Sequence, residues 1–185
     1  MIGSEFDLTG RVAVVTGGAG LLGRQHCRAL LDCGAKVYLA DIRMELVRAA
    51  CNELGENCLP LELDVTQSEC VESALGTVLS EQGRVDILVN NAAIDPKVND
   101  KCLVETSRVE NFPIEQWDFQ LDVGLKGAFL CSKFFGSWMA KNGGGCILNI
   151  ASDLSVFAPD QRIYRRVGVP EESQPVKPVD RKSVV

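Results

Sequence analysis

Residues 12–23 read VAVVTGGAGLLG, and this stretch decides the fold class. Four apolar residues and a threonine make a compact run that is typical of a parallel strand buried on both faces. Glycines follow at positions 18, 20 and 23, in the spacing GxGxxG. At a strand-to-helix turn, Gly18 permits the tight turn, Gly20 lets the backbone approach a pyrophosphate, and Gly23 lets the helix pack on the strand. The first N–H groups of a helix suit an anion, so the stretch predicts a dinucleotide-binding turn.

The alternation of strand and helix continues along the chain. A longer helix is predicted from Pro113 to Met139, and its apolar residues indicate burial on more than one side. The alternation predicts an α/β fold of Rossmann type, a doubly wound parallel sheet with strand order 3-2-1-4-5 and every strand buried on both faces. No further strand can be read from Pro159 onward, so we expect the C-terminal strands of such a sheet to be missing. The predicted strands are residues 11–16, 36–41, 58–64, 85–90 and 145–151, and the other helices are residues 21–33, 44–54 and 69–82.

Composition limits the partners of the chain. It has 185 residues with a formal net charge of -6, which gives no electrostatic attraction for nucleic acid. No run approaches the roughly 18 apolar residues of a membrane span, and the N-terminus lacks the pattern of a signal peptide. We therefore expect a cytoplasmic protein that binds neither nucleic acid nor a membrane.

The eight cysteines form no CxxC pair, and His26 is the single histidine. This pattern does not supply the ligands of a structural zinc site, so no metal is predicted. Cys27, Cys131 and Cys146 fall inside apolar runs, where a reduced cysteine behaves as a small buried hydrophobe. The cysteines are therefore interpreted as reduced structural thiols.

Asp41 ends the second predicted strand, 18 residues after Gly23. An acidic residue at this distance from the glycines accepts hydrogen bonds from the adenosine ribose and repels a 2′-phosphate. NAD is therefore favoured over NADP, although Arg43 could neutralise a phosphate if Asp41 turned away. The alternative is that Asp41 is an ordinary residue of a strand-terminal turn.

Three motifs together resemble the short-chain dehydrogenase/reductase family: TGxxGxxG from Thr16, Asp64-Val65 after the third strand, and NNAA over residues 90–93. The match covers residues 6–152 and favours the core-length branch, although core-length members usually place a glycine where Leu21 stands. The resemblance implies that Asp64 meets the adenine edge and that the NNAA segment lines the cofactor. The cofactor contacts predicted in this way are Gly17, Gly18, Gly20, Leu22, Asp41, Asp64, Val65, Asn91, Ala92 and Ala93.

The resemblance also implies a catalytic serine, tyrosine and lysine, often with an asparagine. Ser152, directly after the fifth predicted strand, stands at the serine position, where it would orient the substrate oxygen; the alternative is a strand-end cap. Gly124 stands at the asparagine position. Tyr164 is a weak candidate for the tyrosine, because Gly168 stands at the lysine position of YxxxK. His26 is interpreted as a helix histidine rather than a substitute base.

The chain is therefore interpreted as a truncated NAD-dependent oxidoreductase that in its intact form transfers hydride between nicotinamide and an alcohol or ketone. We expect the intact protein to be a homo-oligomer and the chain alone to be inactive. Residues 180–185 can be encoded by the start of a common sequencing adapter and are expected to be a non-native tail. The alternatives are a non-catalytic NAD-binding protein and an extended-type sugar-nucleotide epimerase or dehydratase. The predicted division is residues 7–152 for NAD binding, 153–179 for a substrate-side loop and 180–185 for the tail.

Overall fold

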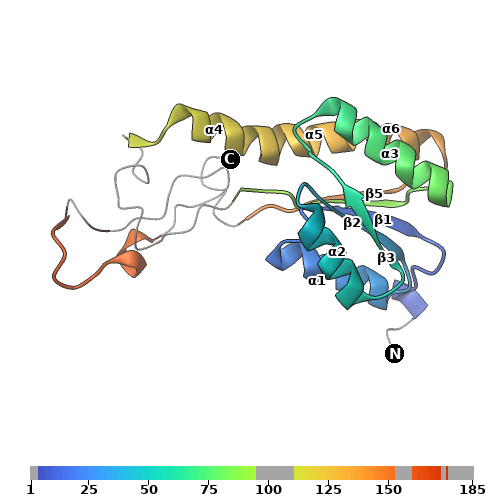
Figure 1. The fold of residues 1–185 in the computed structure, drawn as a ribbon, viewed down its shortest axis with the longest axis horizontal. Helices are drawn as coiled ribbons and strands as arrows, with labels where there is room; N and C mark the ends of the chain where they lie inside the picture. The colour runs from blue at the N-terminus through green and yellow to red at the C-terminus, as the bar shows by residue number, and fades with distance from the viewer. Residues whose placement is uncertain (1–3, 95–110, 153–159, 172–173, 175–185) are drawn as a thin grey trace. The chain divides into compact units, whose positions relative to one another are not determined.

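The computed structural model describes residues 4–94, 111–152, 160–171 and 174 (Figure 1). Within these ranges the strands form one parallel sheet in the order β3-β2-β1-β4-β5. This confirms the predicted fold class and strand order. The strands are β1 (Val12–Thr16), β2 (Lys36–Asp41), β3 (Cys58–Glu62), β4 (Ile87–Asn90) and β5 (Cys146–Asn149).

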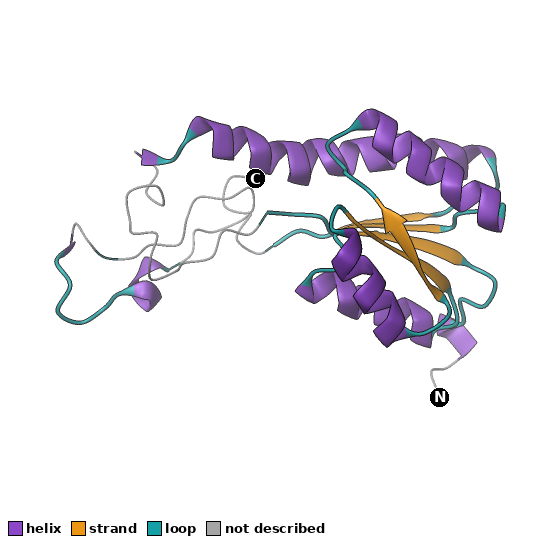
Figure 2. Ribbon diagram, in the orientation of Figure 1, coloured by secondary structure: helices purple, strands orange, loops and turns teal. Residues whose placement is uncertain are grey.

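The helices next to the sheet cover both of its faces, as expected for a doubly wound sheet. Figure 2 shows α1 and α2 on one face and α3 with the helix that precedes β5 on the other. Apolar side chains of α1 and α2 pack with β1 and β2 into a buried cluster that includes Val15, Cys27, Leu39 and Val47. The helices are α1 (Leu21–Asp32), α2 (Met44–Leu54) and α3 (Ser68–Gln82), with the 3-10 turns η1 (Ser4–Phe6) and η6 (Gln161–Tyr164).

The predicted long helix is present, but it is interrupted by two π turns. An i→i+5 turn widens the helix and shifts the face that its later residues present. Five residues form each π turn. The successive segments are α4 (Ile114–Leu121), η3 (Asp122–Lys126), α5 (Gly127–Cys131), η4 (Ser132–Gly136) and α6 (Ser137–Lys141).

The chain divides into two compact units. The first comprises Met1–Ala92 with Leu125–Ile150, and therefore holds the sheet together with α1, α2, α3, α5 and α6. The second comprises Ala93–Gly124 with Ala151–Val185. The predicted adapter-encoded tail and most of the predicted substrate-side loop lie outside the described residues, so those assignments stay predictions.

Two expectations about burial are wrong. β5 is exposed along its whole length, with Leu148 49% accessible, and Cys146 is an exposed thiol rather than a buried one. The reason is that β5 is an edge strand of the described sheet, with β4 as its single neighbour. At the other edge, β3 also departs from the expectation, because Pro60 and Glu62 are exposed. The long helix also buries one stripe rather than several sides: Cys131, Phe135 and Met139 are buried, while Phe129 is 63% accessible.

Candidate functional site

The glycine turn after β1 is shaped by close packing at three of its four glycines. Gly17 has φ +61, and a Cβ there would lie 2.8 Å from the Cα of Ala92. A Cβ on Gly18 would lie 2.7 Å from Cγ of Leu39, and one on Gly23 would overlap the backbone of Gly17 and Gly18. The contacts of Gly23 agree with its predicted role in helix packing, whereas the positive φ of the turn lies at Gly17, and Gly18 is required by its packing against Leu39.

Gly20 is less crowded than the other three, since an added Cβ there would make one tight contact and no overlap. Its φ is -76, and the nearest atom to an added Cβ is the Gly17 carbonyl oxygen at 3.3 Å. Gly20 is the N-cap of α1, and no side chain caps this end of the helix. The N-terminus of α1 is therefore uncapped and exposed, with Leu21 85% accessible, which fits the binding of an anion such as a pyrophosphate. Leu22 lies in the first turn of α1 and is 55% accessible.

Thr16 joins the glycine turn to the segment that follows β4. Its hydroxyl accepts hydrogen bonds from the backbone N–H groups of Asn91 and Ala92, both at 3.0 Å, and donates to the Val89 carbonyl at 3.4 Å. The Asn91 side-chain amide in turn donates to the carbonyls of Thr16 and Gly17 at 3.0 and 3.1 Å. The structure therefore brings together Gly17, Asn91 and Ala92, three of the residues predicted to contact the cofactor.

Asn90 connects β4 to β5 and to the helix above them. Its side-chain amide donates to Asn149 Oδ1 at 2.8 Å and to Ser132 Oγ at 3.0 Å. Asn149 and Ser132 were missed by sequence reasoning. The signal that could have identified Asn149 is the register of the two strands, in which Asn90 and Asn149 are paired.

Asp41 lies at the carboxyl end of β2, beside the glycine turn. The N–H of Gly18 donates to the carbonyl of Ala40 at 2.9 Å, which places the turn against the end of β2. Asp41 is 8% accessible, and its Oδ1 accepts from the backbone N–H of Arg43 at 3.1 Å and from Arg43 Nε at 3.3 Å. The arginine considered as a phosphate ligand is thus paired with the carboxylate, although its side chain remains 59% exposed.

Asp64 and Val65 form the turn between β3 and α3. Asp64 Oδ1 accepts from the N–H of Thr66 at 2.9 Å and from its hydroxyl at 2.7 Å. Val65 is buried. The carboxylate is therefore held by its own turn, and the adenine contact implied by the family resemblance stays a prediction.

The predicted catalytic residues belong to the second unit. Ser152 is half-buried and follows β5 by three residues. Tyr164 is the last residue of the four-residue 3-10 turn η6, and Gly168 has φ +81. Gly124, at the position of the family's asparagine, is buried in the π turn η3. Ala93 also belongs to this unit.

His26 borders a groove that does not include the glycine turn. It lines a groove of about 710 Å³ on the first unit, together with Leu30, Asp86 and Cys146. Its Nε2 is buried and has no hydrogen-bond partner among the described residues. The groove contains none of the predicted cofactor contacts.

Two other kinds of site have no counterpart among the described residues. There, no group of three His, Cys, Asp or Glu side chains has the arrangement of a metal site. None of the helices described is long and apolar enough to cross a membrane.

Comparison with known proteins matches residues 11–164 to the family described as short chain dehydrogenase. The chain is 33% identical over 159 residues to an NAD-dependent glycerol dehydrogenase of Listeria innocua, a match that covers 86% of this chain and 59% of the relative. It is 32% identical over 162 residues to a D-threitol dehydrogenase of Mycolicibacterium smegmatis, with the same two coverages. A crystal structure of gox2181 superposes with a TM-score of 0.76 at 32% identity, over 84% of this chain and 58% of that one. The chain thus spans less than two thirds of the length of these relatives.

Proposed function

Because the chain belongs to the short-chain dehydrogenase/reductase family, we propose that it is the NAD-binding part of an oxidoreductase that acts on alcohols and ketones. The dinucleotide would be held by residues around the glycine turn, all of which belong to the first unit except Ala93. Gly17, Gly18, Gly20 and Leu22 would hold the pyrophosphate, and Asp41 the adenosine ribose. Asp64 and Val65 would meet the adenine, and Asn91, Ala92 and Ala93 would line the cofactor.

One observation carries this proposal: the N-terminus of α1 is uncapped and exposed, and the Asp41 carboxylate ends the neighbouring strand. The helix end offers N–H donors and a partial positive charge to a pyrophosphate. A carboxylate one strand away offers acceptors to ribose hydroxyls. This combination suits a dinucleotide better than an isolated phosphate, which would gain nothing from Asp41.

NAD rather than NADP is the proposed cofactor. A 2′-phosphate beside the largely buried Asp41 would meet a like charge in a medium that screens poorly. Arg43 could offset that repulsion, but its guanidinium is engaged with Asp41 Oδ1. The pair therefore supports ribose hydroxyls as the group recognised at this position.

The bound nicotinamide would supply the hydride donor or acceptor, which no side chain of the protein can provide. Ser152 would donate a hydrogen bond to the substrate oxygen and hold it in place. A small secondary alcohol or ketone is the proposed substrate class, in keeping with the alcohol substrates in the names of the two relatives. The tyrosine and lysine that move the proton in the family have no clear counterpart in this chain. We therefore propose that the chain binds NAD without turning over substrate. The enzyme, and the homo-oligomer, would be the intact protein.

A fluorescence titration with NADH tests the proposal, with Gly20→Val as the decisive variant. The valine side chain would hinder the approach of a pyrophosphate to the N-terminus of α1, and binding should weaken at least tenfold. Gly76→Val is the matched control, because Gly76 lies in α3 and an added Cβ there meets no atom within 4 Å. Equal affinity of wild type and Gly20→Val would exclude the glycine turn as the cofactor site.

A non-catalytic NAD-binding protein is the second candidate. It is favoured by Gly124 at the asparagine position and by Tyr164 in a 3-10 turn with Gly168 four residues later. Sequencing the source DNA across the codon of Val179 separates the two. An open frame that continues into a Tyr-x-x-x-Lys helix supports the enzyme, and a stop codon after genomic codons for residues 180–185 supports the non-catalytic protein.

A further inference from the structure

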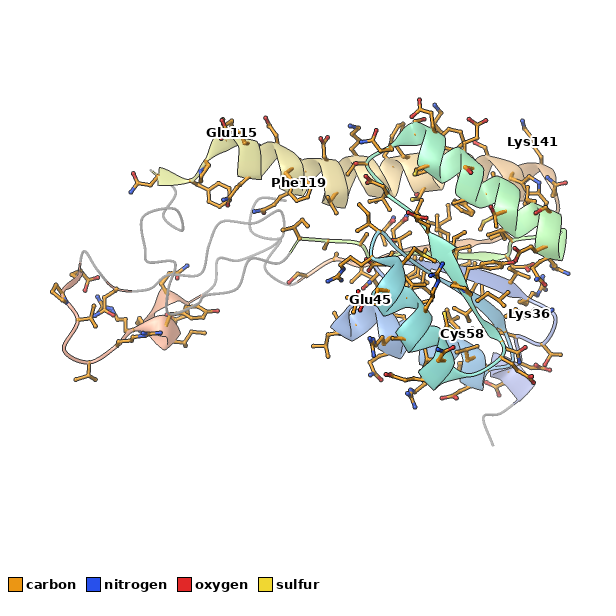
Figure 3. All side chains as sticks on the ribbon, viewed as in Figure 1. Lys36, Glu45, Cys58, Glu115, Phe119 and Lys141 are labelled. Atoms are coloured by element: carbon orange, nitrogen blue, oxygen red, sulfur yellow. The ribbon has the colours of Figure 1, made fainter. Side chains whose placement is uncertain are left out.

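Two buried thiols lie in contact at the start of β3. Cys58, labelled in Figure 3, is the first residue of β3. Cys51 lies in the last turn of α2. The Cys58 thiol donates a hydrogen bond to Cys51 Sγ, with the two sulfur atoms 3.5 Å apart. Both cysteines are free thiols in this structure.

The backbone between the two cysteines is held by hydrogen bonds. The N–H of Gly55 donates to the Cys51 carbonyl at 3.0 Å, and the N–H of Cys58 donates to the Gly55 carbonyl at 3.0 Å. Gly55 has φ +103, a value that residues with a Cβ atom rarely adopt. The N–H of Val37 donates to the Asn57 carbonyl at 2.9 Å and fixes the turn against β2. The two thiols are therefore adjacent because the turn places them so, and they need no large chain movement to react.

The surroundings provide access to the pair from one side. Cys51 is 7% accessible and Cys58 is 4% accessible. A cavity of about 310 Å³ borders both residues and is also lined by Arg48, Glu56 and Pro60. Burial raises the pKa of both thiols, and the neighbouring Cys51 raises the pKa of Cys58 further. Reaction at this site should accordingly be slow and should accelerate with rising pH.

We propose that Cys51 and Cys58 are a redox-active pair that closes to an intramolecular disulfide in the presence of a small-molecule disulfide such as oxidised glutathione. The Cys51 thiolate attacks one sulfur of the oxidant, whose S–S bond breaks, and one glutathione leaves as a thiolate that takes up a proton. The Cys58 thiolate then attacks Cys51 Sγ and displaces the second glutathione. The pair loses two electrons and two protons, and the oxidised glutathione becomes two thiols.

The bond would fasten the end of α2 to the beginning of β3. It lies at the opposite end of the β2–β3 ladder from Asp41, because Cys58 pairs with Val37 whereas Asp41 pairs with Glu62. Closing the bond should therefore raise the melting temperature and leave the affinity for NADH unchanged. The inference is independent of the proposed cofactor site, and either can fail without the other.

Peptide mapping of the oxidised chain tests the proposal directly. The reduced chain is incubated at pH 8 with glutathione at several ratios of oxidised to reduced form, unfolded and blocked with N-ethylmaleimide in denaturant, and digested with trypsin and a glutamate-specific protease. Cleavage after Arg48, Glu53, Glu56 and Glu62 places Cys51 and Cys58 in separate peptides, residues 49–53 and 57–62. We expect these two peptides to be recovered as one disulfide-linked species, with two fewer of the eight cysteines blocked by N-ethylmaleimide.

Variants separate this pair from other thiols. Cys51→Ser and Cys58→Ser should each abolish the linked species and the rise in melting temperature on oxidation, whereas Cys70→Ser, half-buried in α3, should retain both. Cys27 is the nearest rival, since its pKa is raised to about 12 by burial first and by Cys51 second. The proposal would be overturned by a bond from Cys51 to Cys27. It would also be overturned if Cys51 and Cys58 of the wild-type chain were both still blocked by N-ethylmaleimide at every glutathione ratio.

Discussion

Asp86 accepts a hydrogen bond from the backbone N–H of Val12 at 2.9 Å, and thereby ties the approach to β4 to the first residue of β1. The same carboxylate accepts from Arg11 and from Arg84, whose side chains are about half exposed. Asp86 is 8% accessible, so a nearly buried negative charge is compensated by two arginines and one backbone donor. This cluster lies at the amino end of the sheet, opposite to the glycine turn.

The first prediction is that Asp86 makes the stability of the chain depend on acid pH. Burial acts to raise the pKa of Asp86, but the hydrogen bonds from Arg84, Val12 and Arg11 outweigh it, and the net pKa is lowered. A carboxyl group with a lowered pKa stabilises the folded state fully above its unfolded pKa of about 3.9, and this contribution is lost as the pH falls through the lower folded value.

Asp86→Asn should therefore lower the unfolding free energy at pH 7 by about 1–3 kcal/mol. It should also flatten the dependence of stability on pH below about pH 4. Urea unfolding at a series of pH values measures both effects, with Glu72→Gln on the exposed side of α3 as the control. If Asp86→Asn shows the same dependence of unfolding free energy on pH as wild type, the cluster contributes little to stability.

The second prediction concerns the Thr16 hydroxyl. Thr16→Val keeps the shape of the side chain but leaves the N–H groups of Asn91 and Ala92 without their acceptor. The variant should lose about 2 kcal/mol of unfolding free energy, the penalty expected when buried donors lose their partner. Thr16→Ser keeps the hydroxyl and is expected to lose less than half as much, as measured by urea unfolding. Equal losses in the two variants would assign the effect to packing instead.

The strands and most helix ends could be predicted from the sequence, because each is decided by local pattern. Thr16 and Asp41 end their strands where the apolar runs end, and Gly83 ends α3 in a left-handed conformation. The exposure of β5 was missed because its apolar run was interpreted by itself, although the predicted order 3-2-1-4-5 with the later strands missing already makes it an edge strand. The contacts of Thr16 with Asn91 and of Cys51 with Cys58 also escaped prediction, because they depend on the register of neighbouring strands and on the path of a turn.

A third prediction concerns cofactor choice at Asp41. Asp41→Ala removes the charge that opposes a 2′-phosphate and releases Arg43 from its hydrogen bond. The ratio of NADPH affinity to NADH affinity should rise at least tenfold in this variant. The double variant Asp41→Ala/Arg43→Ala should lose most of that gain, because the released guanidinium is then absent. If NADPH already binds the wild-type chain as tightly as NADH, the proposed discrimination is wrong.

A fourth prediction follows from the exposed apolar residues of the long helix. Leu125 and Phe129 lie one turn apart and are 62% and 63% accessible. Exposed neighbours of this kind favour association between molecules. The variant Leu125→Glu/Phe129→Glu should be more monomeric than wild type when measured by light scattering after gel filtration at equal concentration. Lys126→Glu is the control for added negative charge at an exposed position of the same helix segment.

The last prediction is that the chain binds NADH but does not oxidise secondary alcohols with NAD. Tyr164 ends a 3-10 turn of four residues, so it does not project from a helix face together with a residue four positions later. That later position is Gly168, which has no amine to lower the pKa of a tyrosine. Tyr164→Phe should therefore leave the background rate of NADH formation unchanged, while a fluorescence titration of the same preparation shows that the cofactor site is intact. Measurable turnover in wild type that disappears in Tyr164→Phe would identify Tyr164 as the proton donor and would mean that its lysine partner comes from elsewhere in the chain.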